Sequence, residues 1–180
     1  TPAQFFHVMR WHIKNPAKRP MVYFSPKSLL RLKAATSKVE DFTNGSFQKV
    51  IDDPQVNNAS RLIFCSGRVY YDLIAEREKL QEWSTAIVRV ELLYPLPAQE
   101  MAAIAAKHPN ANLLWVQDEP ANQGPWSFVA LRTAEQFGGV GFGGRNLRRV
   151  SRRATASPAT GNHHLHEDEQ KALMQEAFTR

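Results

Sequence analysis

Over residues 61–178, short apolar runs alternate with segments whose apolar positions recur at helical spacing. This pattern predicts most of the fold. Continuous apolar runs bounded by polar residues are typical of strands that are buried on both faces. Such strands are predicted at 61–65, 86–90, 112–116 and 147–151. Apolar positions at helical spacing predict helices over 69–82, 98–107, 126–137 and 167–178. This alternation predicts a three-layer α/β domain with a mostly parallel sheet.

The stretch before residue 61 carries a weaker pattern. Phe5, Met9 and Ile13 recur at helical spacing behind Pro2 and predict a first helix, which must pack on another surface. A linker that contains prolines and cations follows at 15–20 and stops any regular element. Three short elements are then predicted, namely a buried strand at 21–24, one helical turn at 28–32 and an extended segment at 48–51.

The composition is that of an ordinary globular protein. With 180 residues, of which 43% are hydrophobic and 22% charged, the chain suits one domain or one domain with an arm. Its apolar runs are too short to span a bilayer, and no secretory signal is present. Cys65 is the single cysteine, which excludes an internal disulfide and fits a reducing compartment. Because the chain begins at Thr1 with sequence typical of a protein interior, we expect it to be a piece of a longer polypeptide.

The net charge is +6, and the basic residues concentrate at 14–38 and 145–153. A solvated basic edge, or contact with an acidic partner domain, is the simpler interpretation. Nucleic-acid binding is the alternative, and steep salt dependence would be its signature. No zinc-ligand spacing, aromatic RNA-binding signature or recognition-helix pattern accompanies the charge, so no nucleic-acid partner is expected.

Four runs of polar and small residues separate the predicted elements. They are FSPKSLLR at 24–31, CSGRVYYD at 65–72, QDEPANQG at 117–124 and SPATGN at 157–162. Each of the first three follows an apolar stretch and contains residues that start helices. This arrangement is typical of the carboxyl ends of strands in an α/β sheet, where ligands and partner domains usually dock.

In order and spacing, these runs resemble the carboxy-terminal domain of the thiamine diphosphate-dependent, decarboxylating component of 2-oxoglutarate dehydrogenase. The resemblance covers nearly the whole chain. It implies a transketolase-type carboxy-terminal domain at 20–180, preceded at 1–19 by a helix and linker from a pyrimidine-binding domain.

The resemblance also implies an activity for the whole enzyme. That enzyme of the tricarboxylic acid cycle decarboxylates 2-oxoglutarate on thiamine diphosphate with magnesium, and it succinylates a lipoyl group of the succinyltransferase component. This chain lacks the family's cofactor motif, which is Gly-Asp-Gly followed later by Asn-Asn, so neither thiamine diphosphate nor magnesium is expected to bind this domain alone. No catalytic residue is assigned, and the expected role is structural and regulatory within a homodimer.

Lys27, Ser28, Arg31 and Arg68 form the candidate effector site. Cations and a hydroxyl beside helix starts favour anions, because the helix dipole and backbone donors add to the side-chain charge. Local capping and pairing with carboxylates is the alternative. Some relatives bind acetyl-CoA at this domain, and the resemblance therefore implies acetyl-CoA or AMP as an effector. The relatives that bind acetyl-CoA are rich in arginine after the Pro-Leu-Pro turn, whereas this chain carries AQEM at 98–101.

Asp118, Glu119, Asn122 and Gln123 form the candidate interface. Two adjacent carboxylates at a strand end also suit acid–base catalysis or a metal. The neighbouring amides suit positioning better, and no third carboxylate or histidine is near in sequence. In the related enzymes this edge faces the pyrimidine-binding domain and the dimer interface, so an interface role is expected here.

Three further motifs are given structural interpretations. The glycine-rich run at 139–144 contains G-x-G-x-x-G, but it follows a predicted helix, so a flexible loop is expected. His163, His164 and His166 lack the second cluster that a zinc site needs, so no metal is expected. Cys65 has no histidine nearby in sequence, which leaves no candidate nucleophile.

Two other functions remain open at this point. One is the same domain of a transketolase or of another thiamine-dependent 2-oxo acid dehydrogenase. The other is a free-standing acyl-CoA or nucleotide sensor. The expected location is the cytoplasm of a bacterium, or the mitochondrial matrix in a eukaryote, with no membrane partner.

Overall fold

The computed structural model describes residues 1–179, which divide into two compact units. The first unit is Thr1–Lys49 and the second is Val50–Arg180. The division does not coincide with the boundary that was expected after residue 19.

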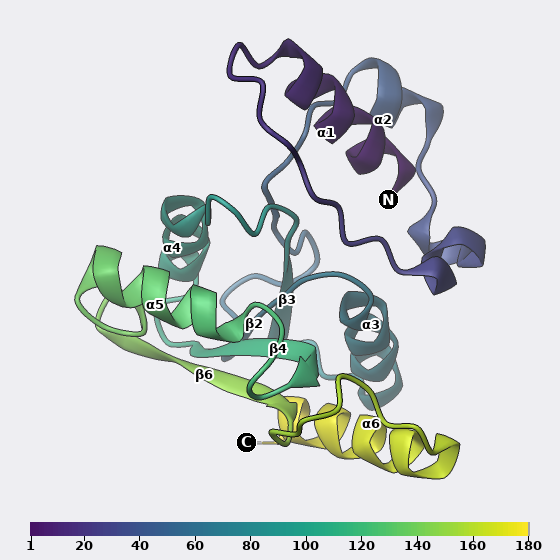
Figure 1. The fold of residues 1–180 in the computed structure, drawn as a ribbon. Helices are drawn as coiled ribbons and strands as arrows, with labels where there is room; N and C mark the ends of the chain where they lie inside the picture. Colours follow the sequence, from purple (N-terminus) through teal and green to yellow (C-terminus); the bar gives the residue numbers. More distant parts are fainter. Residues whose placement is uncertain (180) are drawn as a thin grey trace. The chain divides into compact units, whose positions relative to one another are not determined.

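The second unit is built on a six-stranded sheet with the order β1-β3-β2-β4-β6-β5 (Figure 1). The strands are β1 (Val50–Ile51), β2 (Arg61–Cys65), β3 (Thr85–Val90), β4 (Asn112–Pro120), β5 (Gly141–Phe142) and β6 (Arg145–Arg152). The four central strands pair in parallel, and the two short edge strands pair antiparallel to their neighbours. The prediction of a mostly parallel α/β sheet is confirmed.

Helices cover both faces of this sheet (Figure 1). They are α3 (Val69–Leu80), α4 (Ala98–Lys107), α5 (Trp126–Phe137) and α6 (His163–Phe178). On one face, Phe64 and Trp115 of the strands pack with Met101 of α4 and Val129 of α5. On the other face, the core contains Ile63, Ile87 and Leu114 with Leu73 of α3 and Leu173 of α6. Because both faces are buried, the strands carry the continuous apolar runs from which they were predicted.

Two elements extend beyond their predicted bounds. β4 continues through polar residues to Pro120, because it stays paired with β6 as far as Arg152 across an irregularity in the register. α6 begins at His163 instead of Glu167, because the Asn162 side chain accepts a hydrogen bond from Leu165 N at 3.1 Å and caps the helix there. His163 and His164, which were expected in a loop, therefore lie in the first turn of α6.

The glycine-rich run is ordered around β5, so the prediction of a flexible loop is wrong for this part of the run. Phe142 is buried, with its ring centroid 5.6 Å from that of Phe64 and 5.4 Å from that of Phe137. Gly141 has a φ of 150°, and a Cβ there would lie 1.9 Å from Arg145 O. Only glycine allows this close approach. β6 follows the run, where a dinucleotide fingerprint would need a helix.

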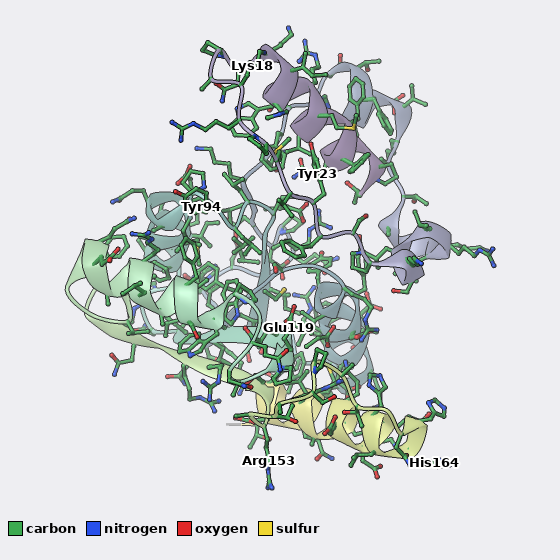
Figure 2. All side chains as sticks on the ribbon, viewed as in Figure 1. Lys18, Tyr23, Tyr94, Glu119, Arg153 and His164 are labelled. Atoms are coloured by element: carbon green, nitrogen blue, oxygen red, sulfur yellow. The ribbon has the colours of Figure 1, made fainter. Side chains whose placement is uncertain are left out.

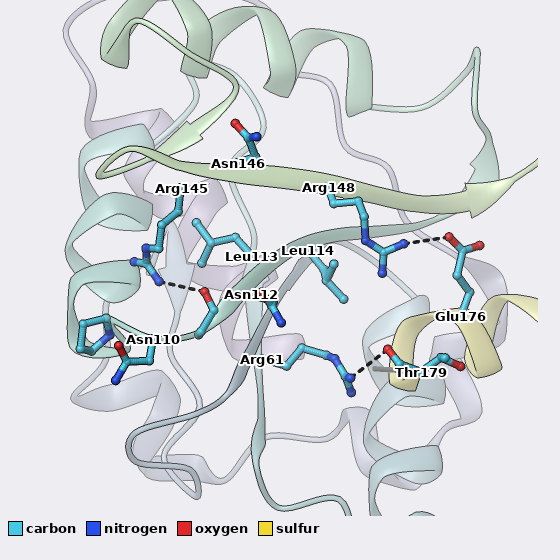
Figure 3. A pocket seen from close by; sticks show the side chains of 12 residues that line it. Arg61, Asn110, Asn112, Leu113, Leu114, Arg145, Asn146, Arg148, Glu176 and Thr179 are labelled. Atoms are coloured by element: carbon cyan, nitrogen blue, oxygen red, sulfur yellow. Dashed lines mark hydrogen bonds and ion pairs between the residues drawn. The ribbon is translucent and has the colours of Figure 1, made fainter.

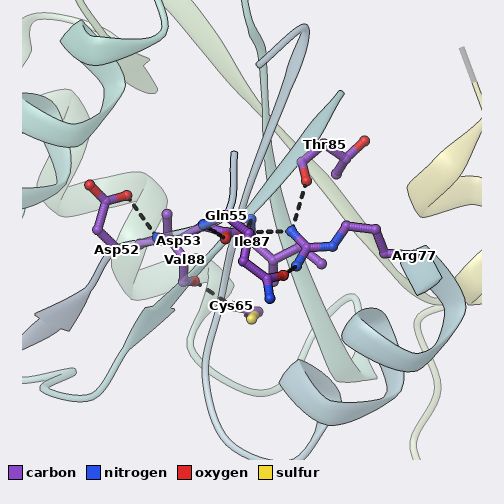
Figure 4. A network of polar contacts seen from close by, with 8 residues as sticks. All are labelled: Asp52, Asp53, Gln55, Cys65, Arg77, Thr85, Ile87 and Val88. Atoms are coloured by element: carbon purple, nitrogen blue, oxygen red, sulfur yellow. Dashed lines mark hydrogen bonds and ion pairs between the residues drawn. The ribbon is translucent and has the colours of Figure 1, made fainter. Parts of the chain in front are cut away.

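A buried ion pair ties the start of the second unit to its sheet (Figure 4). The Arg77 guanidinium donates to the Asp53 carboxylate, to Thr85 O at 3.1 Å and to Gln55 Oε1 at 2.6 Å. Asp53 also accepts from Ile87 N at 2.9 Å. The two charged side chains are only 1% and 3% exposed. The pair therefore fixes the segment after β1 against both α3 and β3.

The first unit contains two α-helices and two 3-10 helices, with few buried side chains. Its elements are α1 (Pro2–Lys14), η1 (Lys27–Arg31), η2 (Lys33–Ala35) and α2 (Val39–Thr43). α1 and the helical turn at η1 are confirmed predictions. His7 Nε2 lies 2.7 Å from Asp41 O and links α1 to α2. Gln4 exchanges two hydrogen bonds with the Gln48 backbone, at 2.7 and 3.0 Å.

Residues 21–24 contradict the prediction of a buried strand. They have no strand conformation, and Phe24 is 84% exposed. Prolines at 20 and 26 flank the run, and each removes a backbone donor that a strand would need. Every strand of the described part of the chain belongs to the second unit. The first of the four polar runs therefore does not follow a strand.

No helix within residues 1–179 is long and apolar enough to cross a membrane.

Candidate functional site

The carboxyl ends of the central strands meet at one edge of the sheet in the second unit. Cys65 pairs with Arg89 of β3 and with Val116 of β4, and Pro120 pairs with Arg152 of β6. Polar and charged residues, among them Arg68, Glu91 and Gln117, follow close behind these positions, so the register gathers them at this edge. We call it the carboxyl edge.

Arg68 and Asp118, which the sequence had placed in separate candidate sites, form an ion pair at the carboxyl edge. Gly67 turns the chain with a φ of 73°, and Arg68 follows at the N-cap position of α3. One guanidinium nitrogen of Arg68 lies 3.0 Å from Asp72 Oδ2 and another lies 3.4 Å from Asp118 Oδ2. An anion that binds Arg68 must therefore compete with two carboxylates of the same protein.

A chain of polar contacts continues from Asp72 toward β6. Gln170 of α6 donates to Asp72 Oδ2 at 3.0 Å and accepts from Arg152 at 2.9 Å. Arg152 Nε also lies 3.8 Å from Glu169 Oε2. Burial raises the pKa of Asp72, and the charge of Arg68 and the hydrogen bond from Gln170 oppose that rise. This chain of contacts joins α3, α6 and β6 through charged side chains.

Gln117 organises the turn between β4 and α5, although it is not among the site residues predicted from the sequence. Its amide nitrogen lies 2.8 Å from Gln123 O, 3.1 Å from Pro120 O and 3.3 Å from Glu119 O. Its amide oxygen accepts from Trp115 Nε1 and from Trp126 N, both at 3.1 Å. The side chain is buried. The sequence did contain a signal for this role, because Gln117 is an amide between an apolar run and a turn that contains Pro120 and Gly124. Such a turn leaves backbone groups that need hydrogen-bond partners.

Asn122 and Gln123 hold a second loop in place. Asn122 donates to Thr155 O at 3.0 Å and accepts from Thr155 N at 3.1 Å. Gln123 donates to Thr155 O at 3.1 Å and to Ser157 O at 3.3 Å. The structure therefore brings the predicted runs at 117–124 and 157–162 into one surface, which we call the loop pair. Arg153 projects outward beside it (Figure 2).

Glu119 belongs to the same turn and lies next to Gly124. Burial raises the pKa of this carboxyl, and the nearby charge of Asp118 adds to the rise. Gly124 has a φ of 66°, and a Cβ there would approach the Glu119 side chain to 2.9 Å. Glycine at this position therefore avoids a clash with the Glu119 side chain, which itself lies at the surface.

Arg89 anchors the other side of the carboxyl edge. Its guanidinium lies 4.7 Å from the Tyr70 ring centroid, and its Nε lies 3.3 Å from Glu91 Oε1. Burial raises the pKa of the Cys65 thiol beneath it, and the charge of Arg89 opposes that rise. The thiol therefore stays protonated near neutral pH, which does not suit a nucleophile.

The charged side chains at this edge are paired with one another. Within residues 1–179, no group of three histidine, cysteine, aspartate or glutamate side chains is placed to hold a metal ion. His163 and His164 lie on the exposed surface of α6, within 4.0 Å of Glu167. Asp118 is engaged with Arg68 and does not face a candidate nucleophile.

The other predicted effector residues lie in the first unit. Lys27, Ser28 and Arg31 belong to the five-residue helix η1, and all three are exposed. Arg68 belongs to the second unit. The four predicted effector residues therefore belong to two different units.

Two arginines of the basic run at 145–153 make contacts within the second unit. At the amino-terminal edge of the sheet, a groove of about 740 Å³ contains Arg145 and Arg148 (Figure 3). Arg145 donates to Ala105 O, His108 O and Ala111 O at 2.6–3.0 Å and so caps the end of α4. Arg148 pairs with Glu176 at 3.1 Å. Arg145 and Arg148 are thus engaged with a helix end and a carboxylate.

Comparisons with known proteins agree on one family. The family model described as "2-oxoglutarate dehydrogenase C-terminal" matches residues 36–178. The chain is 46% identical over 183 residues to the "2-oxoglutarate dehydrogenase E1/E2 component" of Corynebacterium glutamicum, covering 99% of this chain and 15% of the relative. It is 44% identical over 184 residues to the "2-oxoglutarate dehydrogenase E1 component" of Cupriavidus necator, covering 100% of this chain and 19% of the relative. It is 42% identical over 185 residues to the "2-oxoglutarate dehydrogenase, mitochondrial" of Caenorhabditis briggsae, covering 99% of this chain and 18% of the relative. The chain thus spans less than a fifth of each of these relatives.

Proposed function

The chain belongs to the family of 2-oxoglutarate dehydrogenase C-terminal domains, and from this premise we propose that it is the carboxy-terminal structural and regulatory domain of such an enzyme. The whole enzyme decarboxylates 2-oxoglutarate on thiamine diphosphate and passes the succinyl group to a lipoyl arm of the succinyltransferase component. The observation that carries this proposal is the family match over 36–178, together with relatives of that name at 42–46% identity.

The proposed contribution of this domain is assembly, not chemistry. The carboxyl edge offers paired charges and positioned amides, and its buried thiol is protonated. Thiamine diphosphate needs magnesium bound to oxygen ligands. Within residues 1–179, no group of three histidine, cysteine, aspartate or glutamate side chains is placed to hold such an ion, which supports this proposal. The residues that hold the cofactor and its magnesium belong, in this proposal, to the rest of the enzyme.

The loop pair is the proposed contact surface toward the preceding domains and the second subunit of a homodimer. Asp118, Glu119, Asn122 and Gln123 lie together there, held by Gln117 and by the Thr155 backbone. Fixed loops at the carboxyl edge of a parallel sheet suit such a role, because their polar groups are positioned before a partner arrives.

An effector site that includes Lys27, Ser28 and Arg31 of the first unit is the proposed regulatory element, with acetyl-CoA or AMP as ligand. Arg68 of the second unit is a separate candidate anion contact. Lys27→Ala combined with Arg31→Ala should weaken acetyl-CoA binding, because each lost charge-assisted contact costs roughly 1.5–3 kcal/mol. Calorimetric titration of the chain measures this change. An unchanged titration curve removes these residues from the site.

The proposed location is the bacterial cytoplasm, or the mitochondrial matrix for a eukaryotic source. The family match does not favour a transketolase or a free-standing sensor. The direct test uses the full-length polypeptide that contains this chain and follows reduction of an artificial electron acceptor. The proposal requires turnover with 2-oxoglutarate well above that with pyruvate or branched-chain 2-oxo acids. Preference for another 2-oxo acid contradicts it.

A further inference from the structure

The groove at the amino-terminal edge of the sheet lies between the ends of two helices (Figure 3). α4 ends at Lys107 and α6 ends at Phe178, and the residues just beyond them, Pro109 and Thr179, line the groove. Its volume of about 740 Å³ is within the range of sites that hold organic ligands. Every described residue of its lining belongs to the second unit, so that unit forms the groove alone.

The strand register places a row of polar side chains along the groove. Arg61 of β2 pairs with Asn112 of β4. One position further, Leu113 of β4 pairs with Leu147 of β6. Asn146 precedes Leu147, so Arg61, Asn112 and Asn146 lie at the starts of three adjacent strands. Adjacent strands are about 4.8 Å apart, so this row spans about 10 Å, which is the length of three residues of an extended peptide.

Asparagine side chains contribute unpaired amides to the groove. Asn110, Asn112 and Asn146 are exposed, and their side chains form no hydrogen bond with any residue that the structure describes. An asparagine amide carries both donors and an acceptor. A backbone peptide group needs the same combination of partners. The three amides therefore suit the backbone of a bound peptide.

Two arginines of the groove offset the charge of the helix ends. Arg145 donates to three carbonyls at the end of α4, and Arg61 donates to Thr179 O, after the end of α6, at 2.9 Å. The carboxyl ends of helix dipoles are negative, so these contacts leave a site without a strong positive potential. This balance disfavours a doubly charged phosphate. No aromatic side chain is among the described lining residues, so a nucleotide base would have nothing to stack on.

Arg148 is the cation of the groove that can exchange its partner. It pairs with Glu176 of α6 at 3.1 Å, and the two side chains are 53% and 50% exposed. Ion pairs at such exposure are weak, so a carboxylate from a ligand can replace Glu176 at little cost. A guanidinium binds a carboxylate through two parallel hydrogen bonds, which also fixes the orientation of the ligand.

We propose that this groove binds an extended peptide segment with one acidic side chain, whose carboxylate replaces Glu176 on Arg148. The asparagine amides bind the peptide backbone on either side of that acidic residue. This site goes beyond the proposed function, because it lies at the opposite edge of the sheet from the loop pair.

A peptide array incubated with the full-length polypeptide that contains this chain tests the proposal. The array holds peptides of about seven residues, which are long enough to span the polar row. They are printed as matched triplets that differ only in a central Glu, Gln or Lys, with uncharged residues elsewhere. The proposal predicts that the Glu members bind and that the Gln and Lys members do not. The Glu peptide that binds best is then labelled with a fluorophore and titrated by anisotropy.

Substitutions in the exchangeable ion pair should act in opposite directions on this titration. Arg148→Ala should weaken binding ~10-fold or more, because a charge-assisted contact is lost. Glu176→Gln should strengthen binding ~2- to 5-fold, because Arg148 is released from its partner. If the pair had only a structural role, neither substitution would strengthen binding. Arg132→Ala is the matched control, because Arg132 pairs with Glu135 at 2.6 Å and is 41% exposed, and it lies outside the groove lining. It should leave the affinity unchanged.

Three results would overturn the proposal. The first is equal binding of the Glu and Gln members of the array. The second is equal affinity of the Arg148→Ala and Arg132→Ala variants for the labelled peptide. The third is displacement of the peptide by free glutarate at the peptide's own dissociation constant, because a small dicarboxylate would then suffice and the peptide backbone would contribute nothing.

Discussion

Gln117→Leu should destabilise the second unit through the turn between β4 and α5. The substitution preserves much of the buried volume, but Trp115 Nε1 and Trp126 N lose their acceptor and Gln123 O loses its donor. Each buried polar group left without a partner costs ~1–3 kcal/mol, so three such groups cost at least ~3 kcal/mol. That loss is a large share of the ~5–15 kcal/mol that stabilises a typical domain.

Urea unfolding of the 180-residue chain measures this loss as a lower midpoint. Gln117→Glu separates the two functions of the amide, because the carboxylate keeps the acceptor for both tryptophan groups and loses the donor to the carbonyls. Its cost should therefore decrease as the pH falls and the acid becomes able to donate. Gln99→Leu, at an exposed position on α4, is the matched control and should change stability by less than ~0.5 kcal/mol. A loss below ~1 kcal/mol for Gln117→Leu would refute the organising role of this residue.

Three further predictions follow from the same contacts. Asp53→Asn leaves the buried Arg77 charge without its partner and should cost ~3–5 kcal/mol in the free energy of unfolding, whereas a cost near zero in urea titration would contradict this role. Burial raises the pKa of Asp72 above its ordinary value of 3.8, so the folded state binds this proton more tightly than the unfolded state does. The contribution of Asp72 to stability is present at lower pH and is lost as the pH rises through the raised pKa. Asp72→Asn should therefore flatten this part of the plot of unfolding free energy against pH. An unchanged plot would argue against this role of Asp72. Glu119→Ala or Gln123→Ala in the full-length enzyme should weaken dimerisation or turnover while thiamine diphosphate still binds, and wild-type sedimentation together with wild-type turnover would exclude the interface role.

The core of the second unit could be predicted from the sequence because consecutive residues of each strand carry the pattern that forms it. Leu62, Ile63 and Phe64 are consecutive and fully buried, since alternate side chains face two different helical layers. A short apolar run that lies between turns and segments of helical periodicity is typical of a strand that is covered on both faces. The same argument failed at 21–24, where an equally apolar run is exposed. A short apolar run shows that a surface must be covered, but it does not say by what.

The site could be predicted only in part, because its geometry depends on strand register. Arg68 meets Asp118 since β2 and β4 are neighbours that pair Cys65 with Val116. Nothing local in the sequence connects those two positions. The run at 145–153 shows the same limit. Its clustered arginines alternate along β6 and reach opposite faces, where Arg149 lies over Trp126 and Arg152 contacts Gln170. One basic cluster in sequence thus becomes several separate contacts in space.

The most direct test of the account is calorimetric titration of the 180-residue chain with thiamine diphosphate in the presence of magnesium. The account assigns this domain an assembly and regulatory role, with cofactor residues elsewhere in the enzyme. It therefore predicts no measurable heat of binding for the chain, while the full-length enzyme binds the cofactor and turns over 2-oxoglutarate. Tight binding of thiamine diphosphate to the chain alone would contradict that division of roles.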